Sequence, residues 1–191
     1  MSKKQDRTND FTAGQILARL ERLARLIRSS SHTKGLIAAQ WEALRYLSRA
    51  NRFSNSPGAL SRYLGATKGT TSQTVLSLIK KGTIAKSVRQ DDGRSINLVL
   101  TEAGQQILNE DPLLNLDKQI AELSEKTTKR FRKGLDELLH SEVERLGEPS
   151  FGNCDGCTHA DKKSDKIWCK ILRVEIDSAE KQKLCIHHKA K

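Results

Sequence analysis

The sequence predicts a mainly α-helical protein with one small β-hairpin, followed by a small C-terminal module rich in cysteine. Three observations predict this fold class. Apolar residues recur every three or four positions through most of residues 11–148, as in amphipathic helices. Alternating apolar residues surround a "DDG" turn, as in a hairpin. All four cysteines of the 191-residue chain come after residue 153, which separates a main domain from an appendage.

The first helix is expected from Phe11 to Arg28, after a disordered polar tail over residues 1–10. Its apolar stripe consists of Ile16, Leu20, Leu23 and Ile27. A second helix is expected in "LIAAQWEALRYLSRA". Its apolar side consists of Ile37, Trp41, Leu44 and Leu47. The apolar stripe of the first helix needs a partner surface, so the first helix should pack against another element.

Two short helices joined by a tight turn are expected next, in "NSPGALSRYLGATKGTTSQTVLSLIKKG". Ser56 precedes Pro57, a favoured first helical residue, and the helix that begins there should run to Leu64. Thr67 is placed to cap the following helix, which should end before Gly82. The outward face of this second helix is polar and contains no carboxylate.

The hairpin and the helices around it indicate a larger motif. Residues 84–100 are typical of two strands joined by a turn, and "TEAG" starts another helix at Thr101. The order helix, helix, turn, helix, basic hairpin is that of a winged helix-turn-helix. From Thr101 to Glu148 the pattern is helical, and Pro112 is expected to kink or divide the first helix of this segment.

Together with the N-terminal stripe, these helices have more apolar surface than one small lobe needs. Residues 11–148 are therefore expected to form a winged helix-turn-helix domain flanked by dimerisation helices.

The charge of the chain is concentrated in one region. The net charge is +11 at pH 7, and residues 33–100 account for +8 of it, with eleven Lys and Arg against three Asp and Glu. A basic surplus that coincides with a helix-turn-helix pattern favours an anionic partner such as nucleic acid over a merely solubilising surface. No apolar run approaches the ~20 residues that span a bilayer, and the first residues lack a signal-peptide core. A cytoplasmic location without membrane contact is therefore expected.

Three stretches carry a family resemblance: "AAQWEALRYL", "LSRYLGATKGTTSQTVLSLIKKGTI" and "RQDDGRSINLVLTEAG". Through them, the segment from about Gly35 to Leu108 resembles the MarR family of bacterial winged-helix transcription regulators, and the flanking helices fit the layout of that family. The resemblance implies a homodimer with interlocked N- and C-terminal helices. It also implies one recognition helix per subunit in the major groove of double-stranded DNA and a wing reaching toward the minor groove.

The resemblance places the DNA contacts in the second short helix and in the wing. The implied contact residues are Lys68, Gly69, Thr70, Ser72 and Gln73 in the helix, and Asp92 and Arg94 in the wing. Side-chain chemistry supports several of them, because Lys68 can neutralise a phosphate and Gln73 can pair with adenine through two hydrogen bonds. The family often has arginine where this chain has Gln73, so a changed base preference is expected. The alternatives to DNA contact are structural. The polar helix face would then only be solvated, and Arg94 would only form an ion pair that fixes the wing.

The C-terminal module, residues 154–191, follows a linker at residues 149–153. It contains Cys154, Cys157, Cys169 and Cys185. The first two are separated by two residues that include Gly156, so both sulfurs can bind one ion, and two further thiolates would complete a tetrahedral shell. A module this short cannot bury much of a core, so a bound metal would supply the missing folding energy and staple it together.

The identity of this metal stays open between zinc and an iron–sulfur cluster. Zinc sites usually have a second close cysteine pair, which this sequence lacks, and single distant cysteines are common in cluster sites. Zinc, however, needs no assembly machinery and suits a small stapled module. Unrelated thiols and a redox-switched disulfide are the remaining alternatives.

The sequence thus predicts a sequence-specific DNA-binding transcription regulator that acts as a homodimer and is not an enzyme. It contains no nucleophile–base constellation, phosphate loop or cofactor fingerprint. The cysteine module would act as a structural staple or as a sensor, with a small molecule or a redox change as effector. Other hypotheses are a regulator controlled by a ligand bound between its lobes, with purely structural cysteines, a thiol oxidoreductase that uses "CDGC", and an adaptor that holds a partner protein.

Overall fold

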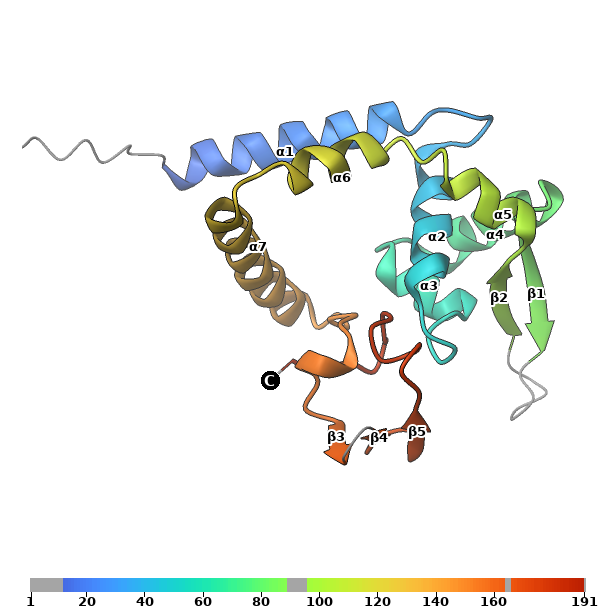
Figure 1. Cartoon of the computed structure of the whole chain (residues 1–191). Coiled ribbons are helices and arrows are strands. Elements are labelled where there is room, and N and C mark those ends of the chain that lie inside the picture. Colours follow the sequence, from blue (N-terminus) through green and yellow to red (C-terminus); the bar gives the residue numbers. More distant parts are fainter. Residues whose placement is uncertain (1–11, 89–95, 164–165, 191) are drawn as a thin grey trace, which may run out of the picture.

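The computed structural model describes residues 12–88, 96–163 and 166–190 (Figure 1). Its helices are α1 (Ala13–Ser30), α2 (Ala38–Arg49), α3 (Pro57–Tyr63), α4 (Lys68–Lys80), α5 (Glu102–Leu108), α6 (Leu114–Ala121), α7 (Glu125–Leu146) and the short 3-10 helix η1 (Cys154–Gly156). Its strands are β1 (Ile84–Val88), β2 (Ile96–Leu100), β3 (Ala160–Lys163), β4 (Lys166–Cys169) and β5 (Val174–Ile176). Strands β1 and β2 form one antiparallel sheet, and β3, β4 and β5 form a second in that order. Over these described residues, no helix has the length and apolar character needed to cross a membrane.

The helix pair α3 and α4 follows from local capping signals. The hydroxyl of Ser56 accepts a hydrogen bond from the backbone N–H three residues later, at 3.2 Å, and Pro57 begins α3. Thr67 caps α4 in the same way, also at 3.2 Å. Gly65, between the two helices, has a φ of +57°, a conformation that favours glycine. The predicted helix-turn-helix is therefore confirmed to within one residue at the ends of these helices.

The main core lies between α2, α3, α4 and the β1–β2 hairpin. Its most buried apolar side chains are Trp41, Leu44, Tyr46, Leu60, Leu78, Ile84 and Leu98. Ile84 pairs with Leu100 across the hairpin, and the N–H of Leu98 donates to the carbonyl of Asn55 at 2.8 Å. The hairpin is thereby fixed against the loop between α2 and α3. The mainly helical fold with one small wing is confirmed, whereas the expected "DDG" turn lies outside the described residues.

Helices α1, α6 and α7, all within the described chain, contain no buried residue. Figure 1 shows them outside the lobe that contains α2–α5 and the hairpin, which we call the main lobe. Their exposed apolar residues include Leu17, Leu26, Ile120, Phe131, Leu138 and Leu146. Single helices of this kind are marginal in water unless an apolar face is packed, so these helices need a further surface to cover them. The chain between α5 and α6 contains Pro112, which confirms the predicted division.

The linker and the C-terminal module are both in contact with the main lobe. Phe151 is only 7% exposed, belongs to the main core, and meets the rings of Tyr46 and Tyr63 edge-on at centroid distances of 5.8 and 5.1 Å. Leu184 forms a parallel β-bridge with Ala50, just after α2. The segment between α7 and the module therefore contributes a buried aromatic ring to the main core.

Candidate nucleic-acid interface and cysteine cavity

Helix α4 presents one polar, solvent-facing side near its N-terminal end. The five residues predicted for recognition, Lys68, Gly69, Thr70, Ser72 and Gln73, are all exposed. The opposite side is buried through Thr71, Thr74, Val75 and Leu78. The helix contains no Asp or Glu, so its own side chains bring no negative charge against a phosphate. The structure thus gathers the predicted recognition residues on one accessible face.

The hydrogen bonds of α4 leave the middle of this face available. The hydroxyls of Thr67 and Thr70 lie 2.9 Å apart and bond to each other. Among the described residues, Ser72 and Gln73 make no side-chain hydrogen bond or ion pair. A free glutamine amide can donate and accept at once, which is what the major-groove edge of adenine requires. The unpaired N–H groups at the start of α4 and the charge of Lys68 add positive potential there.

The wing can be followed only along its strands. The last described pair of the hairpin joins Val88 and Ile96. Val88 is 65% exposed and Lys86 is also exposed, so the strands leave the core and run into solvent. The predicted wing contacts, Asp92 and Arg94, lie outside the described residues and stay predictions.

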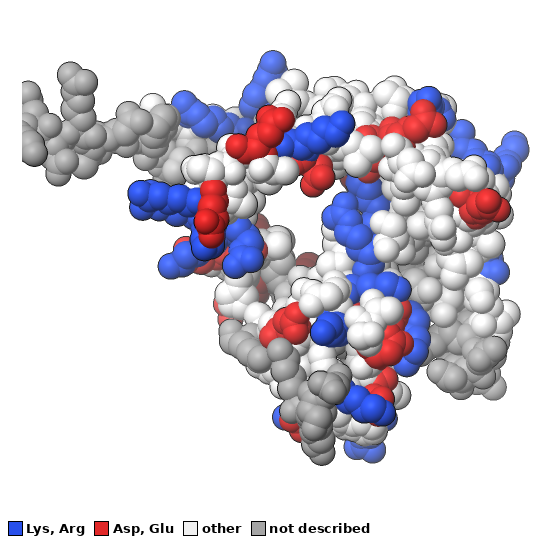
Figure 2. All heavy atoms as spheres, viewed as in Figure 1, with Lys and Arg blue, Asp and Glu red and all other residues white. Residues whose placement is uncertain are grey.

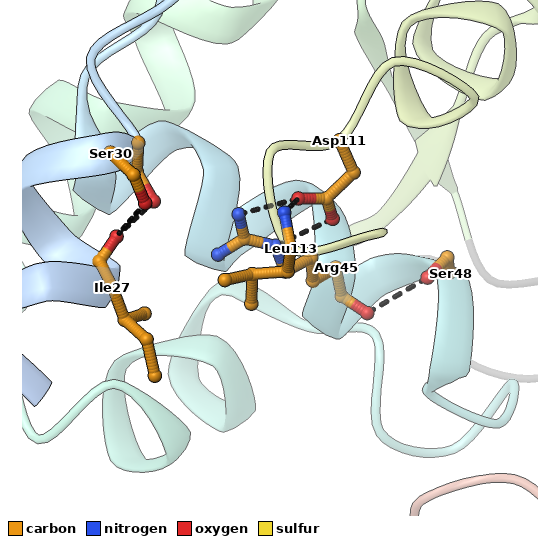
Figure 3. A network of polar contacts seen from close by, with 7 residues as sticks. Ile27, Ser30, Arg45, Ser48, Asp111 and Leu113 are labelled. Atoms are coloured by element: carbon orange, nitrogen blue, oxygen red, sulfur yellow. Dashed lines mark hydrogen bonds and ion pairs between the residues drawn. The ribbon is translucent and has the colours of Figure 1, made fainter. Parts of the chain in front are cut away.

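A buried ion pair joins α2 to the connection between α5 and α6 (Figure 3). Arg45 donates to both carboxylate oxygens of Asp111, at 2.6 and 2.7 Å, and these side chains are 8% and 10% exposed. The N–H of Leu113 donates to the same carboxylate at 2.8 Å. Burial alone would raise the pKa of Asp111, but these hydrogen bonds and the charge of Arg45 outweigh burial and hold that pKa below its ordinary value. No local sequence pattern marks this pair, whose members lie 66 residues apart.

A cleft of about 720 Å³ opens beside this ion pair, between the main lobe and α7. Its lining includes Ile27, Arg45, Arg49, Arg62, Tyr63, Leu139 and Val143. Figure 2 shows basic side chains on the wall of a hollow in this region. Arg62 is paired with Glu148 at 3.2 Å across the rim. Glu42 and Glu148 also line the cleft, and Arg45 and Arg62 are paired with carboxylates, so Arg49 is the cation best placed to attract a small organic anion between the apolar walls.

The four cysteines converge on one small cavity in the C-terminal module. Cys154, Cys157, Cys169 and Cys185 all line it, and each is between 7% and 9% exposed. The first begins η1, the second follows η1, the third ends β4, and the fourth lies beside the end of α2. All four are free thiols and not disulfides. The cavity volume is about 10 Å³, roughly the space that one water molecule needs.

The cavity brings together the predicted ligand set without forming a closed site for a single ion. Among the described residues, no group of three or more His, Cys, Asp or Glu residues is arranged so that it could hold a metal ion. Burial raises the pKa of the Cys154 thiol to about 11, and the other three cysteines act in the same direction. A cation among the sulfurs would reverse this effect by favouring thiolates. The metal stays a prediction, while the convergence of its four expected ligands is a structural fact.

A histidine closes one side of the cavity. Nδ1 of His188 lies 2.6 Å from the hydroxyl of Ser150, and burial lowers the pKa of this imidazole. The ring lies so close to Gly152 that a Cβ there would come within 2.4 Å of it. The imidazole is therefore held in place by its neighbours.

Comparisons with known proteins bear on the winged helix-turn-helix region. Residues 34–95 match the model of the MarR family. A probable transcriptional regulator from Pseudomonas aeruginosa is similar at 26% identity and a TM-score of 0.52, over 68% of this chain and 98% of that chain. The S. aureus MepR–DNA complex is similar at 19% identity and a TM-score of 0.55, over 70% of this chain and 99% of that chain. A Mycobacterium tuberculosis MarR family protein in complex with salicylic acid is similar at 23% identity and a TM-score of 0.50, over 68% of this chain and 98% of that chain.

These structural similarities establish a winged-helix fold. The solved structures are covered almost entirely, whereas this chain is covered to 68–70%, so it contains residues that they do not match. No curated protein matches the sequence.

Proposed function

We propose that this protein is a MarR-type transcriptional regulator that binds double-stranded DNA sequence-specifically as a homodimer. The observation that carries the proposal is the exposed, carboxylate-free face of α4 inside a winged helix-turn-helix region of charge +8. The family match over residues 34–95 and the likeness to the MepR–DNA complex support it. In this role α4 enters the major groove, and the wing with Asp92 and Arg94 lies at the minor groove.

The residues of α4 divide into those that position the helix and those that read bases. Lys68 neutralises a phosphate, and Thr70 and Ser72 bond to phosphates or base edges. Gly69 has no side chain, so the DNA backbone can approach the start of the helix closely. Gln73 is the principal reading residue, because its amide matches the donor and acceptor of adenine.

The homodimer is proposed from the exposed apolar residues of α1, α6 and α7. A second copy of the chain offers these helices a matching apolar surface, and burying apolar surface contributes about 25 cal/mol per Å². A dimer also carries two recognition helices, which can contact two half-sites about one turn of DNA apart. Dimerisation and DNA recognition are thus parts of the same proposal.

The proposal is tested by Gln73→Ala. The test duplex is the one that the wild-type protein selects from a random-sequence library. We expect the variant to bind this duplex more weakly by about 1–3 kcal/mol per half-site, the value of one bidentate base contact. Gln73 is exposed and makes no internal side-chain bond among the described residues, so the unfolding transition should not move. Fluorescence anisotropy measures the binding and circular dichroism the unfolding.

A matched control is Gln105→Ala, which removes an exposed glutamine of α5 outside the recognition face. It should bind the duplex as the wild type does. If Gln73→Ala also keeps wild-type affinity, Gln73 does not read a base. If the wild type selects no sequence at all from the library, the proposed function is wrong.

We further propose that the four cysteines bind a metal centre as thiolates, either zinc or an iron–sulfur cluster. The convergence of all four on one cavity and the absence of disulfides among them support this proposal. A small apolar cluster surrounds the site, formed by Ile167 and Ile176 with Leu172 and Val174 packed against them. So few apolar residues make a small core, which a bound metal would reinforce.

A second candidate function is control of DNA binding by a small organic anion in the 720 Å³ cleft. Arg49 and Tyr63 provide the charge and the aromatic surface, and salicylic acid is the ligand of one similar protein. Salicylate is then expected to weaken DNA binding by the wild type, and Arg49→Ala should reduce this response without changing the affinity for DNA alone. The same response in both proteins would exclude the cleft as the site.

A further inference from the structure

The loop between α2 and α3, residues 50–56, begins against the C-terminal module. The carbonyl of Leu184 accepts a hydrogen bond from the N–H of Asn51 at 2.9 Å, and the N–H of Leu184 donates to the carbonyl of Arg49 at 2.8 Å. Asn51 is only 1% exposed, so its buried backbone depends on such a partner. The stretch around Leu184 therefore fixes the start of this loop.

Two further hydrogen bonds from the module hold the middle of the loop. The N–H of Arg52 donates to the carboxylate of Glu180 at 2.8 Å, and the N–H of Ile186 donates to the hydroxyl of Ser54 at 2.9 Å. Glu180 and Ser54 are 9% and 0% exposed, and the second carboxylate oxygen of Glu180 accepts from Lys183 at 2.7 Å. A buried polar group that loses its partner is costly, so the loop keeps this conformation only while the module stays in place.

The module and the main lobe also exchange apolar side chains. Phe53 of the loop packs against the small core of the module. The buried residues of that core are Cys154, Ile167, Cys169 and Ile176. In the other direction, Phe151 of the linker is buried in the main core, and Leu184 and Ile186 pack against it. Each core thus includes a side chain from outside it, so the two parts are expected to hold a fixed arrangement.

The far end of the same loop positions the elements proposed to face DNA. Ser56 caps α3, and the carbonyl of Asn55 accepts from the N–H of Leu98 in the wing strand β2 at 2.8 Å. The hydroxyl of Tyr46 donates to the carbonyl of Ser54 and ties the loop to α2. Helix α3 in turn packs against α4. A change at the module can thus reach α4 and the wing through a contiguous series of contacts.

We propose that the C-terminal module positions the DNA-contacting elements of the main lobe, with Glu180 and Phe53 as the positioning residues. Neither residue contacts DNA. Both hold the loop that sets the places of α3 and the wing strand β2. The proposal rests on the proposed DNA-binding function and does not depend on what the four cysteines bind. Loss of either contact leaves α4 folded but misplaced, so DNA affinity falls while the fold persists.

The first test measures the affinity of full-length variants for the selected duplex by fluorescence anisotropy. We expect Glu180→Ala to weaken binding by about 2- to 30-fold, the usual effect of a mutation on the path between two sites. Glu180→Gln should restore most of the affinity, since its amide oxygen still accepts from the N–H of Arg52. Phe53→Ala should weaken binding in the same range, and Phe53→Leu should weaken it less. If Glu180→Ala does not fold, the two Phe53 variants decide in the same way.

The second test follows the loop itself and needs no DNA. The N–H of Leu98 should exchange with solvent faster in Glu180→Ala than in the wild type, because its acceptor, the carbonyl of Asn55, belongs to the loop. The N–H of Leu44, in the middle of α2, is the reference, because its exchange reports opening of the whole lobe. We expect a larger increase at Leu98 than at Leu44, measured by NMR.

The matched control is Glu175→Ala, which removes an exposed carboxylate of β5 that pairs with Lys166 at 2.8 Å. It should bind the duplex as the wild type does. A loss in this control as large as that in Glu180→Ala overturns the proposal, because general damage to the module would then explain both. Wild-type affinity in both Glu180→Ala and Phe53→Ala overturns it too, as does an equal increase in exchange at Leu98 and Leu44. If the wild type selects no DNA, the proposed function is wrong, and exchange at Leu98 still decides whether the module holds the loop.

Discussion

Replacement of Leu138 by glutamate is expected to convert the protein into monomers and to lower its affinity for a two-fold symmetric duplex by about 100-fold or more. Leu138 is 55% exposed on α7, and its neighbours Leu135 and Leu139 are 39% and 60% exposed. In the proposed dimer this side would be buried, and an unpaired carboxylate in such an interface costs several kcal/mol. A monomer contacts one half-site with one recognition helix, so it loses the gain from simultaneous engagement.

The control for this prediction is His140→Glu, which introduces the same side chain on the same helix. His140 is exposed and two residues further on, so it points to the opposite side of α7. Sedimentation should show a dimer for His140→Glu and a monomer for Leu138→Glu. His140→Glu should also bind the duplex more tightly than Leu138→Glu does. A dimer retained by Leu138→Glu would show that α7 does not form the interface through this face.

The parts of the fold that sequence patterns predicted are those set by neighbouring residues. Ser56 with Pro57, and Thr67 with Gly65 in the turn before it, specify where α3 and α4 begin, because capping involves residues only three positions apart. The exposed face of α4 follows from the same local information, since helical geometry assigns each residue to a side. The exposure of Lys68, Gly69, Thr70, Ser72 and Gln73 could therefore be predicted without a structure, whereas their role in recognition comes from the family resemblance and stays a prediction.

The parts that sequence patterns did not predict depend on contacts between distant residues. Phe151 lies in a segment whose glycines and proline are typical of a linker, yet its ring is buried against Tyr46 and Tyr63. Nothing near Leu184 in the sequence indicates that its backbone pairs beside the end of α2. Such contacts are set by the shape of the assembled core, so no local periodicity encodes them.

The cysteine site shows the same division. The spacing of Cys154 and Cys157 predicts that they share a site, and the structure places Cys169 and Cys185 at the same cavity. What the spacing could not indicate is that Cys185 is carried by the stretch bound to Arg49 and Asn51. A module that looks like a separate appendage in the sequence is thus joined to the loop that precedes α3.

The ion pair between Arg45 and Asp111 yields the largest expected effect on folding. Asp111→Ala is expected to lower the free energy of unfolding by about 3–5 kcal/mol at pH 7, because it leaves a buried guanidinium without a partner. Replacing both residues, as in Arg45→Met with Asp111→Leu, should cost less than the single change, since no unpaired charge remains. Urea unfolding at one fixed protein concentration measures both, because dimerisation makes stability depend on concentration.

The pH dependence of this pair has a definite sign. The pKa of Asp111 is lower in the folded protein than in the unfolded chain, where an Asp has a pKa of about 3.9. Its contribution is therefore fully present above the unfolded pKa and is lost as the pH falls through the folded pKa. The difference in unfolding free energy between wild type and Asp111→Ala should accordingly be constant near neutrality and shrink in acid. The matched control is Asp117→Ala, which removes an exposed carboxylate of α6 and should cost less than about 1 kcal/mol. A difference that stays constant down to low pH, or a control as damaging as Asp111→Ala, would mean that the Arg45 pair does not hold α2 against the connection between α5 and α6.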